Sequence, residues 1–393
     1  MTPPLPRTDF PVTERWTYLN HAGVAPLPRP AVEAMAGYAG RVAAGGSLTV
    51  EGHGARAEEV RATAAGLMGV ARTDVAFVKN TTEGLGFVAN GLTWRPGDRV
   101  VVPDFEFPST LYPWLALREL GVVVDLVAPR GRGGCLPVEA FAEVMAAGPP
   151  PKVVATSWVQ FGRGWRTDLA GLATVCHDAG ALLCADVIQG LGVVPADLAA
   201  WGVDFAMADA HKWLLGPEGI GVLYVAADRL DLLRPLEAGW ASVAHREQWD
   251  NRELIYHDDA RRLEGGSHNA AGIHAMGASL DLLTGAGMEA VWGHVERLCD
   301  RACTGLAEEA GATVLSDRSP GGRSGIVTFR LDGLDAATMH RELGDQGIVC
   351  SPRGGGIRIA PHGYNTTEEI ERLVAAVGQL AGGTGRSAAG TAR

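Results

Sequence analysis

The sequence predicts an α/β fold in which helices cover a mostly parallel sheet of seven strands, followed along the chain by a smaller C-terminal α+β domain. Two observations support this prediction. Short runs rich in β-branched residues alternate with amphipathic stretches of helical length. These runs are apolar at nearly every position, which is typical of strands that are buried on both faces of a sheet.

The expected elements follow a βαβα order, which favours parallel strands joined by helices. Strands are expected at 75–78, 100–102, 122–127, 153–156, 181–185, 205–208 and 221–225. The helices between them are expected at 82–90, 110–120, 138–146 and 169–178. Near residues 261–269 the pattern changes, and helices at 272–283, 290–309 and 367–380 accompany a strand–helix–strand stretch.

The chain is expected to divide at these changes of pattern. We expect an N-terminal arm at 1–17, a large domain at 18–262 and a small domain at 263–381. Residues 382–393 consist of Gly, Ser, Ala, Thr and Arg, a composition that predicts a disordered tail.

The composition narrows the class of protein. A net charge of −11 argues against a nucleic acid or an anionic membrane as partner, since both would repel an acidic surface. No apolar run reaches the roughly 20 residues that cross a bilayer, and the first residues lack the apolar core of a signal peptide. We therefore expect a cytoplasmic enzyme. The six cysteines show no metal-binding spacing, so no metal is expected.

A phosphate cradle is expected where the strand at 75–78 runs into a helix. Asn80 and Glu83 have the spacing of a capping box. The hydroxyls of Thr81 and Thr82 and the free amides at this helix N-terminus could hold a phosphate. An ordinary helix cap would leave the same pattern.

Three further side chains lie at the ends of expected strands. Asp186 follows an apolar strand and could pair with the ring nitrogen of a bound heterocycle, although such residues also cap helices. Lys212 lies in an apolar, Gly-flanked segment, so its amine should lose its proton easily and attack an aldehyde. Phe107 could stack on the ring or simply fill the core.

Together these residues resemble the class V group of fold-type I enzymes that depend on pyridoxal 5′-phosphate (PLP), a group that includes cysteine desulfurases, isopenicillin N epimerase and related lyases. The resemblance runs from Tyr-Leu-Asn-His-Ala-Gly at 18–23 to Pro-His-Gly-Tyr-Asn-Thr at 361–366. Its most specific part is His-Lys-Trp-Leu-Leu-Gly-Pro-Glu-Gly at 211–219, which follows Asp-Val-Ile-Gln at 186–189.

The resemblance implies a role for each matching residue. Lys212 would hold PLP as a Schiff base and move protons, and Arg358 would bind the substrate carboxylate. The remaining cofactor contacts would come from Thr81, Thr82, Phe107, Gln160, Asp186, Gln189, His211 and, on a loop that reaches into a neighbouring subunit, Ser267. That loop implies a homodimer with shared sites. His21 and Trp240 are candidates for reading the distal part of the substrate.

The chain departs from the family pattern at two positions. Asp209 stands where relatives often carry a neutral phosphate ligand such as Ser, and a carboxylate there would repel phosphate unless it is turned away. Cys350 lies in a short segment against an apolar strand, whereas desulfurases carry their nucleophilic cysteine on a long loop. We expect Cys350 to be structural.

The expected reaction is removal of the Cα proton by Lys212 followed by expulsion of a β-substituent, most plausibly a thiolate, from a cysteine S-conjugate in specialised metabolism. Transamination, epimerisation and the decarboxylating deamination of lincosamide-type antibiotic pathways remain alternatives with the same cofactor. A non-catalytic protein with this fold is the alternative from another class, and it predicts disrupted cofactor residues.

Overall fold

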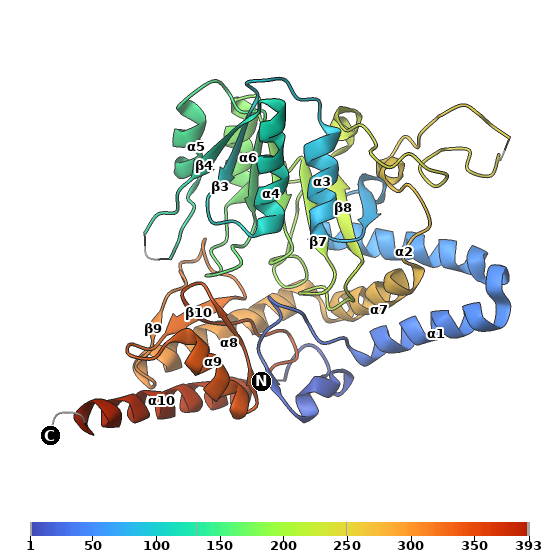
Figure 1. Cartoon of the computed structure of the whole chain (residues 1–393). Coiled ribbons are helices and arrows are strands. Elements are labelled where there is room, and N and C mark those ends of the chain that lie inside the picture. The colour runs from blue at the N-terminus through green and yellow to red at the C-terminus, as the bar shows by residue number, and fades with distance from the viewer. Residues whose placement is uncertain (1, 132, 249, 391–393) are drawn as a thin grey trace.

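The computed structural model describes residues 2–131, 133–248 and 250–390. It consists of a large domain around a seven-stranded sheet and a smaller domain around a four-stranded sheet (Figure 1). The large sheet has the order β2-β8-β7-β6-β5-β3-β4. Its strands are β2 (Val75–Val78), β3 (Arg99–Pro103), β4 (Val123–Val127), β5 (Val153–Ser157), β6 (Leu182–Asp186), β7 (Phe205–Asp209) and β8 (Gly221–Val225).

The sheet is mostly parallel, as the sequence predicts. Strands β3 to β7 pair in parallel with one another, and β8 runs antiparallel to both of its neighbours, β2 and β7. Since every strand from β5 to β7 ends at the same edge, residues that follow these strands are brought together there. All seven predicted strands lie within two residues of the observed bounds.

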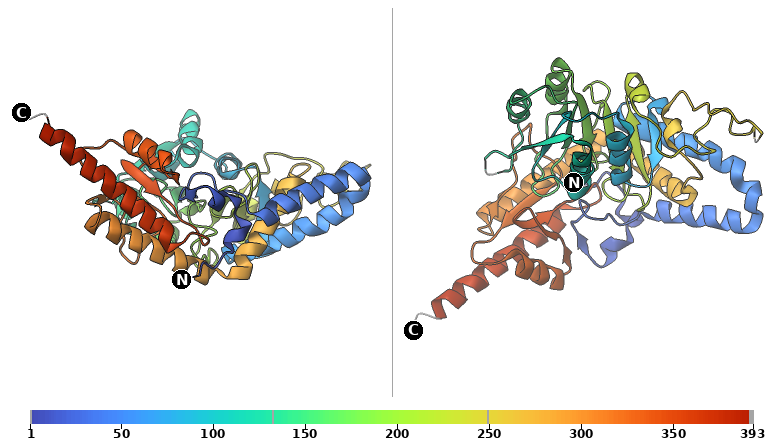
Figure 2. Two further views of the ribbon diagram at one scale, coloured as in Figure 1. Left: turned by 90° about the horizontal axis from the view of Figure 1, so that it is seen from below. Right: turned by 45° about the horizontal axis from the view of Figure 1, so that its top comes forward.

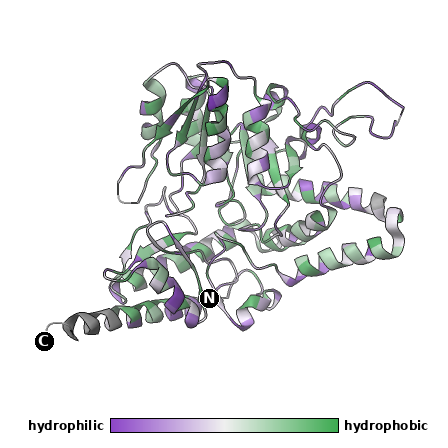
Figure 3. Ribbon diagram, in the orientation of Figure 1, coloured by the Kyte–Doolittle hydropathy of each residue, from purple (hydrophilic) through white to green (hydrophobic). Residues whose placement is uncertain are grey.

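Helices cover both faces of the sheet because alternate strand residues point to opposite faces. In β2, Val75 and Phe77 belong to one apolar cluster and Ala76 and Val78 to the other. One face is covered by α3 (Thr81–Gly91) and α4 (Pro108–Ala116), and the other by α5 (Val138–Ala146), α6 (Leu169–Asp178) and α7 (Ala270–Ala286). Figure 3 shows the strands as a largely hydrophobic layer.

The smaller domain is built on an antiparallel sheet with the order β12-β13-β10-β9. Its strands are β9 (Thr313–Val314), β10 (Val327–Arg330), β12 (Ser351–Arg353) and β13 (Gly356–Ile359), and its helices are α8 (Met288–Glu308), α9 (Ala336–Asp345) and α10 (Thr367–Gly390). The predicted disorder from residue 382 stays a prediction: α10 continues to Gly390, and residues 391–393 lie outside the described part of the chain.

The N-terminal segment packs against the smaller domain. Strand β1 (Thr17–Tyr18) pairs in parallel with β11 (Ile348–Val349), and the Phe10 ring stacks on the Tyr364 ring at 3.8 Å between centroids. The first residues of the chain therefore tie the C-terminal domain to the segment that enters the large domain.

Two helices that the sequence does not reveal, α1 (Arg29–Gly45) and α2 (Val50–Met68), project from the body as an antiparallel pair, and α7 lies against them (Figure 2). They carry a weak apolar pattern, since α1 buries only Ala31. The predicted helix at 110–120 is divided into α4 and a 3₁₀ turn at Leu117–Leu120. No helix in the described ranges is long and apolar enough to span a membrane. Further 3₁₀ turns lie at Arg7–Asp9, Pro11–Glu14, Gly46–Thr49, Arg72–Asp74, Ala227–Leu232 and Ala260–Leu263.

Candidate active site

A cavity of about 510 Å³ opens at the carboxyl edge of the large sheet, between the ends of β5, β6 and β7 and the β12–β13 hairpin of the smaller domain. This is the edge where parallel α/β sheets bind ligands. The predicted site residues that line it are Thr81, Thr82, Phe107, Asp186, Gln189, His211, Lys212 and Arg358.

One end of the cavity is formed by the N-terminus of α3. The Asn80 side chain caps this helix by accepting a 2.9 Å hydrogen bond from the Glu83 amide. The first amides of a helix have no partner within it, so those of Thr81 and Thr82 are free to bind an anion. The Thr82 hydroxyl donates to Ser109 Oγ at 2.8 Å, which adds a third hydroxyl to this end of the cavity.

The Asp186 carboxylate lies at the end of β6 and is 3% exposed. Its Oδ1 accepts a 3.0 Å hydrogen bond from the Ile188 amide, and its Oδ2 accepts one of 2.8 Å from Thr110 Oγ1. Burial raises the pKa of Asp186, and these two hydrogen bonds oppose that effect. A buried carboxylate held in one orientation is suited to pair with a protonated ring nitrogen.

Lys212 lies on the connection between β7 and β8, whose ends are joined by the pairing of Asp209 with Gly221. Burial lowers the pKa of its amine to about 8, so a substantial fraction is neutral near physiological pH. The Lys212 Nζ lies 5.6 Å from the centre of the Phe107 ring, which is 42% exposed in the cavity. The amine and a ring that can stack on a flat heterocycle therefore face the same space.

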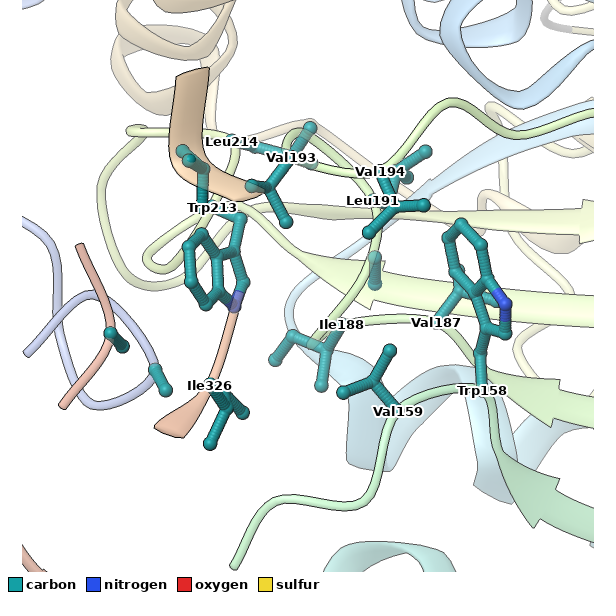
Figure 4. Packing of buried hydrophobic residues seen from close by; sticks show 14 of the residues in the cluster. Trp158, Val159, Val187, Ile188, Leu191, Val193, Val194, Trp213, Leu214 and Ile326 are labelled. Atoms are coloured by element: carbon teal, nitrogen blue, oxygen red, sulfur yellow. The ribbon is translucent and has the colours of Figure 1, made fainter. Parts of the chain in front are cut away.

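The residues after Lys212 are anchored in the apolar core, where Trp213 and Leu214 lie beside Val193 (Figure 4). Trp213 Nε1 also donates a 3.0 Å hydrogen bond to Gln189 Oε1. Gly192 has a φ of +98°, and a Cβ there would lie 2.4 Å from the Trp213 carbonyl oxygen, so this close approach requires glycine.

Arg358 is a buried cation on β13, 4% exposed. Its Nη1 donates to the Phe161 carbonyl at 2.6 Å and its Nη2 to Asn20 Oδ1 at 3.4 Å, while Nε makes no hydrogen bond within the described residues. Burial lowers the pKa of Arg358 to about 10, and nearby Arg353 adds to that effect. Since no carboxylate of the described residues pairs with it, Arg358 is available to a substrate carboxylate.

Four predicted site residues lie outside this cavity. Gln160 uses its Oε1 to accept hydrogen bonds from the amides of Gly162 and Arg163. His21 is fully buried, with Nδ1 2.7 Å from the Ala360 carbonyl and Nε2 2.8 Å from the Tyr364 hydroxyl.

Both ring nitrogens of His21 are thus engaged, and the suggestion that it reads the substrate finds no support in this geometry. Ser267 is exposed in a different depression, beside Lys79 and Glu237. Trp240 is 48% exposed and lines a third hollow. Their roles toward a neighbouring subunit stay predictions.

The sequence did not single out Ser351 and Arg353, which line the cavity beside Arg358. In the β12–β13 hairpin, Ser351 lies directly opposite Arg358, and Arg353 lies two residues further along the same strand face. The spacing of two between Ser351 and Arg353 indicates that both side chains lie on the same face of β12. It identifies them as cavity residues only once the pairing of β12 with β13 is known.

The cavity suits the cofactor expected from the sequence. Thr81 Oγ1 is a buried polar atom without a hydrogen-bond partner in the described structure, and Thr81 lines the cavity where α3 begins. Unpartnered buried polar atoms are costly unless a ligand satisfies them. Thr81, Thr82 and His211 would hold the phosphate, Phe107 would face the ring, Asp186 would meet the ring nitrogen and Lys212 would carry the covalent link.

Comparison with known proteins agrees with this geometry. The family model described as Aminotransferase class-V matches residues 17–373. A protein named probable cysteine desulfurase from Methanothermobacter thermautotrophicus is 30% identical over 96% of this chain and 97% of its own length.

Two solved structures share the fold. A cysteine desulfurase from Thermococcus onnurineus NA1 superposes with a TM-score of 0.85 at 26% identity, covering 96% of this chain and 97% of the other. A C-DES variant with glycine covalently linked to its PLP cofactor has a TM-score of 0.86 at 23% identity, covering 95% of this chain and 99% of the other.

Proposed function

This chain belongs to the class-V aminotransferase family of PLP-dependent enzymes, and on that basis we propose that it is a lyase that breaks the C–S bond of cysteine-derived amino acids by β-elimination. The proposal concerns the reaction and the class of substrate. The cysteine-derived part is suggested by relatives named cysteine desulfurase. The distal group on sulfur is left unspecified.

The cavity supplies the groups that this reaction needs. When bound, the cofactor withdraws electrons from Cα of the amino acid joined to it. Arg358 holds the substrate carboxylate and so orients the Cα–H bond. The neutral Lys212 amine, favoured by its low pKa, accepts the Cα proton at Nζ. The electron pair of the Cα–H bond then forms a Cα–Cβ double bond, and the Cβ–S bond breaks with its pair on sulfur.

The single observation that carries the choice of elimination is that no described residue lining the cavity is a cysteine. The nearest candidate by sequence, Cys350, is 3% exposed in the core, and burial raises its pKa to about 12. It is therefore a protonated thiol without access to substrate. Sulfur that is released here has no protein thiol to receive it and leaves with its substituent as a free thiol.

The test is to incubate the purified holoenzyme with a panel of cysteine S-conjugates and measure thiol and pyruvate. The proposal expects equal amounts of thiol, pyruvate and ammonia. Exchange of the Cα proton for solvent deuterium without loss of substrate would instead indicate epimerisation, and accumulation of pyridoxamine phosphate would indicate transamination. Absence of thiol release from every conjugate overturns the proposal.

We also propose that the enzyme works as a homodimer. Ser267 is exposed and lies outside the cavity of its own chain, on a loop that begins at the buried Glu264. A second copy is a partner that would bring it to a phosphate site. Light scattering tests the oligomeric state, and Ser267→Trp tests the contact: the dimer proposal expects weaker cofactor binding in this variant.

A further inference from the structure

Asp209 places a carboxylate at the end of the cavity that suits a phosphate. It is the last residue of β7, it is 6% exposed, and it lines the cavity together with Thr81, Thr82 and His211. Its Oδ1 accepts no hydrogen bond from any residue in the described ranges. The backbone of Asp209 is fixed by its pairing with Gly221, so the carboxylate can move away from the cavity only by rotation of the side chain.

Two potential cations lie near Asp209. One is His211, whose Nδ1 lies 3.0 Å from Asp209 Oδ1 in an orientation that makes no hydrogen bond. The other is Lys212: burial lowers the pKa of its amine, and the charge of Asp209 opposes that effect. The other ligands at this end are the neutral hydroxyls of Thr81, Thr82 and Ser109. The cavity's two arginines, at positions 353 and 358, belong to the β12–β13 hairpin of the smaller domain.

A phosphate monoester carries about −1.5 to −2 charges at neutral pH. A carboxylate in the same partly buried cradle opposes that charge, because like charges repel most where water cannot screen them. Lys212 interacts more strongly with Asp186 than with Asp209, so the His211 imidazole is the main group left to balance both the phosphate and Asp209. Asp209 therefore makes the binding of a phosphate weaker than it would be with a neutral residue at the same position.

We propose that Asp209 weakens the hold of this site on the cofactor's phosphate and thereby keeps the cofactor exchangeable with the free pool. Asp209 acts through electrostatic repulsion and takes no part in the bond-breaking steps. The inference rests on the cofactor of the family and is independent of the reaction proposed above. An enzyme built this way gains and loses its cofactor as the supply of PLP changes.

The experiment measures the phosphate contribution to binding without reference to activity. Cofactor-free protein is titrated with PLP and with pyridoxal, which lacks the phosphate, and protein fluorescence reports the two dissociation constants. The dissociation constant of pyridoxal divided by that of PLP measures the contribution of the phosphate, because both ligands carry the same aldehyde. A higher ratio means a tighter hold on the phosphate. The ratio is compared among wild type, Asp209→Asn and Asp209→Ser.

We expect both variants to raise the ratio by on the order of tenfold. Any effect of Asp209 on the Lys212 amine acts on both ligands and cancels in the ratio. PLP should also be lost more slowly from both variants during gel filtration. Asp209→Ser introduces a hydroxyl like those of the rest of the cradle, so it serves as the second variant if Asp209→Asn does not fold.

The control is Asp178→Asn, which removes one exposed carboxylate at the end of α6, beside the start of β6 and remote from the cavity. Its ratio should equal that of wild type. A ratio that is unchanged or lower in a folded Asp209 variant overturns the proposal, and so does an equal rise in Asp178→Asn. A rise in only one of two folded Asp209 variants also overturns it, since loss of charge is what they share.

Discussion

Thr110 donates a 2.8 Å hydrogen bond from its hydroxyl to Oδ2 of Asp186, linking the first turn of α4 to the end of β6. Thr110 is fully buried and does not line the cavity, so it acts on a ligand only through the carboxylate that it orients. Asp186 would contact the cofactor directly, whereas Thr110 only positions Asp186, so we expect their substitutions to have different effects.

Asp186→Asn should lower kcat by on the order of 100-fold or more, because an amide cannot hold the charge of a protonated ring nitrogen. Thr110→Val should lower kcat by about tenfold, because it removes one hydrogen bond to a charged group, which is worth about 1.5 kcal/mol. Thr110→Ser should restore activity close to wild type. Steady-state kinetics and the cofactor absorption spectrum of each holoenzyme test these expectations. An equal loss of kcat in Asp186→Asn and Thr110→Val would contradict the view that Thr110 acts only by orienting Asp186.

The attachment of PLP to Lys212 should depend on pH. Burial lowers the pKa of this amine to about 8, and only the neutral amine attacks an aldehyde. The initial rate of chromophore formation in cofactor-free protein should therefore rise about tenfold per pH unit below pH 8 and level off above it.

Lys212→Ala should form no borohydride-stable adduct. Lys152→Ala serves as the matched control, because Lys152 pairs with Asp98 away from the cavity. Peptide mapping after borohydride reduction locates the adduct. An adduct on another lysine in the wild-type protein would remove Lys212 from its assigned role.

Arg358→Gln should raise the dissociation constant of amino-acid substrates by about 10- to 150-fold, the equivalent of a charge-assisted hydrogen bond worth about 1.5–3 kcal/mol. The cofactor affinity should stay unchanged, because Arg358 lies on the hairpin of the smaller domain. Amino-acid amides, which lack the carboxylate, provide the control: their weak binding should be the same in wild type and variant. A loss of affinity that is equal for acids and amides would contradict a carboxylate contact.

Cys350→Ser should leave the turnover of cysteine S-conjugates within about twofold of wild type while lowering the free energy of unfolding by roughly 1–3 kcal/mol, because a hydroxyl is buried where a thiol packed. The side chain lies in the core and not in the cavity. Loss of turnover in a protein that melts cooperatively would assign Cys350 to the chemistry and return the desulfurase reaction as the better hypothesis.

Glu264→Gln should destabilise the protein by about 3 kcal/mol at neutral pH, because it removes one of the two carboxylates that pair with the buried Arg61 and leaves only the partly exposed Glu58. Glu264 accepts hydrogen bonds from both terminal nitrogens of Arg61 and from the Phe77 amide. Burial opposes the charge on Glu264, but His268 and Arg61 outweigh it and lower its pKa to about 2.

A folded-state pKa below the unfolded value means that this stabilisation is complete above pH 4–5 and is lost as the pH falls toward 2. The difference in stability between wild type and Glu264→Gln, measured by denaturant melts, should stay constant from pH 7 to about pH 5 and shrink steadily from there toward pH 2. A constant difference across that range would contradict the assignment of the stabilisation to this carboxylate.

Much of the large domain and its part of the site could be predicted because parallel strands gather their ends at one edge. Asp186 and Lys212 follow buried strands, and that rule alone brings them together. The smaller domain's contribution could not be predicted in this way. Arg353 lines the cavity because of the register between β12 and β13. The register between such short strands cannot be predicted from the local sequence alone.

Local contacts explain why Gln160 and His21 do not line the cavity. Gln160 sits where a cofactor contact was expected, but its side chain turns back to the amides of its own loop. His21 is drawn into the core because the segment that carries it pairs with the smaller domain. The α1–α2 pair was missed because neither helix has a clear apolar period: α1 buries only Ala31, and half of the apolar residues that α2 buries are alanines.

The two walls of the cavity differ in how they are supported. Lys212 and Asp186 stand on the central sheet, and the chain on either side of Lys212 is locked into that sheet and its core. Arg358 stands on β13 of the smaller domain, an inner strand that pairs with both β12 and β10. Because the carboxylate-binding arginine and the attachment point of the cofactor stand on separate sheets, a small shift of one domain against the other would change the distance between Arg358 and Lys212 while leaving Lys212 and Asp186 in place.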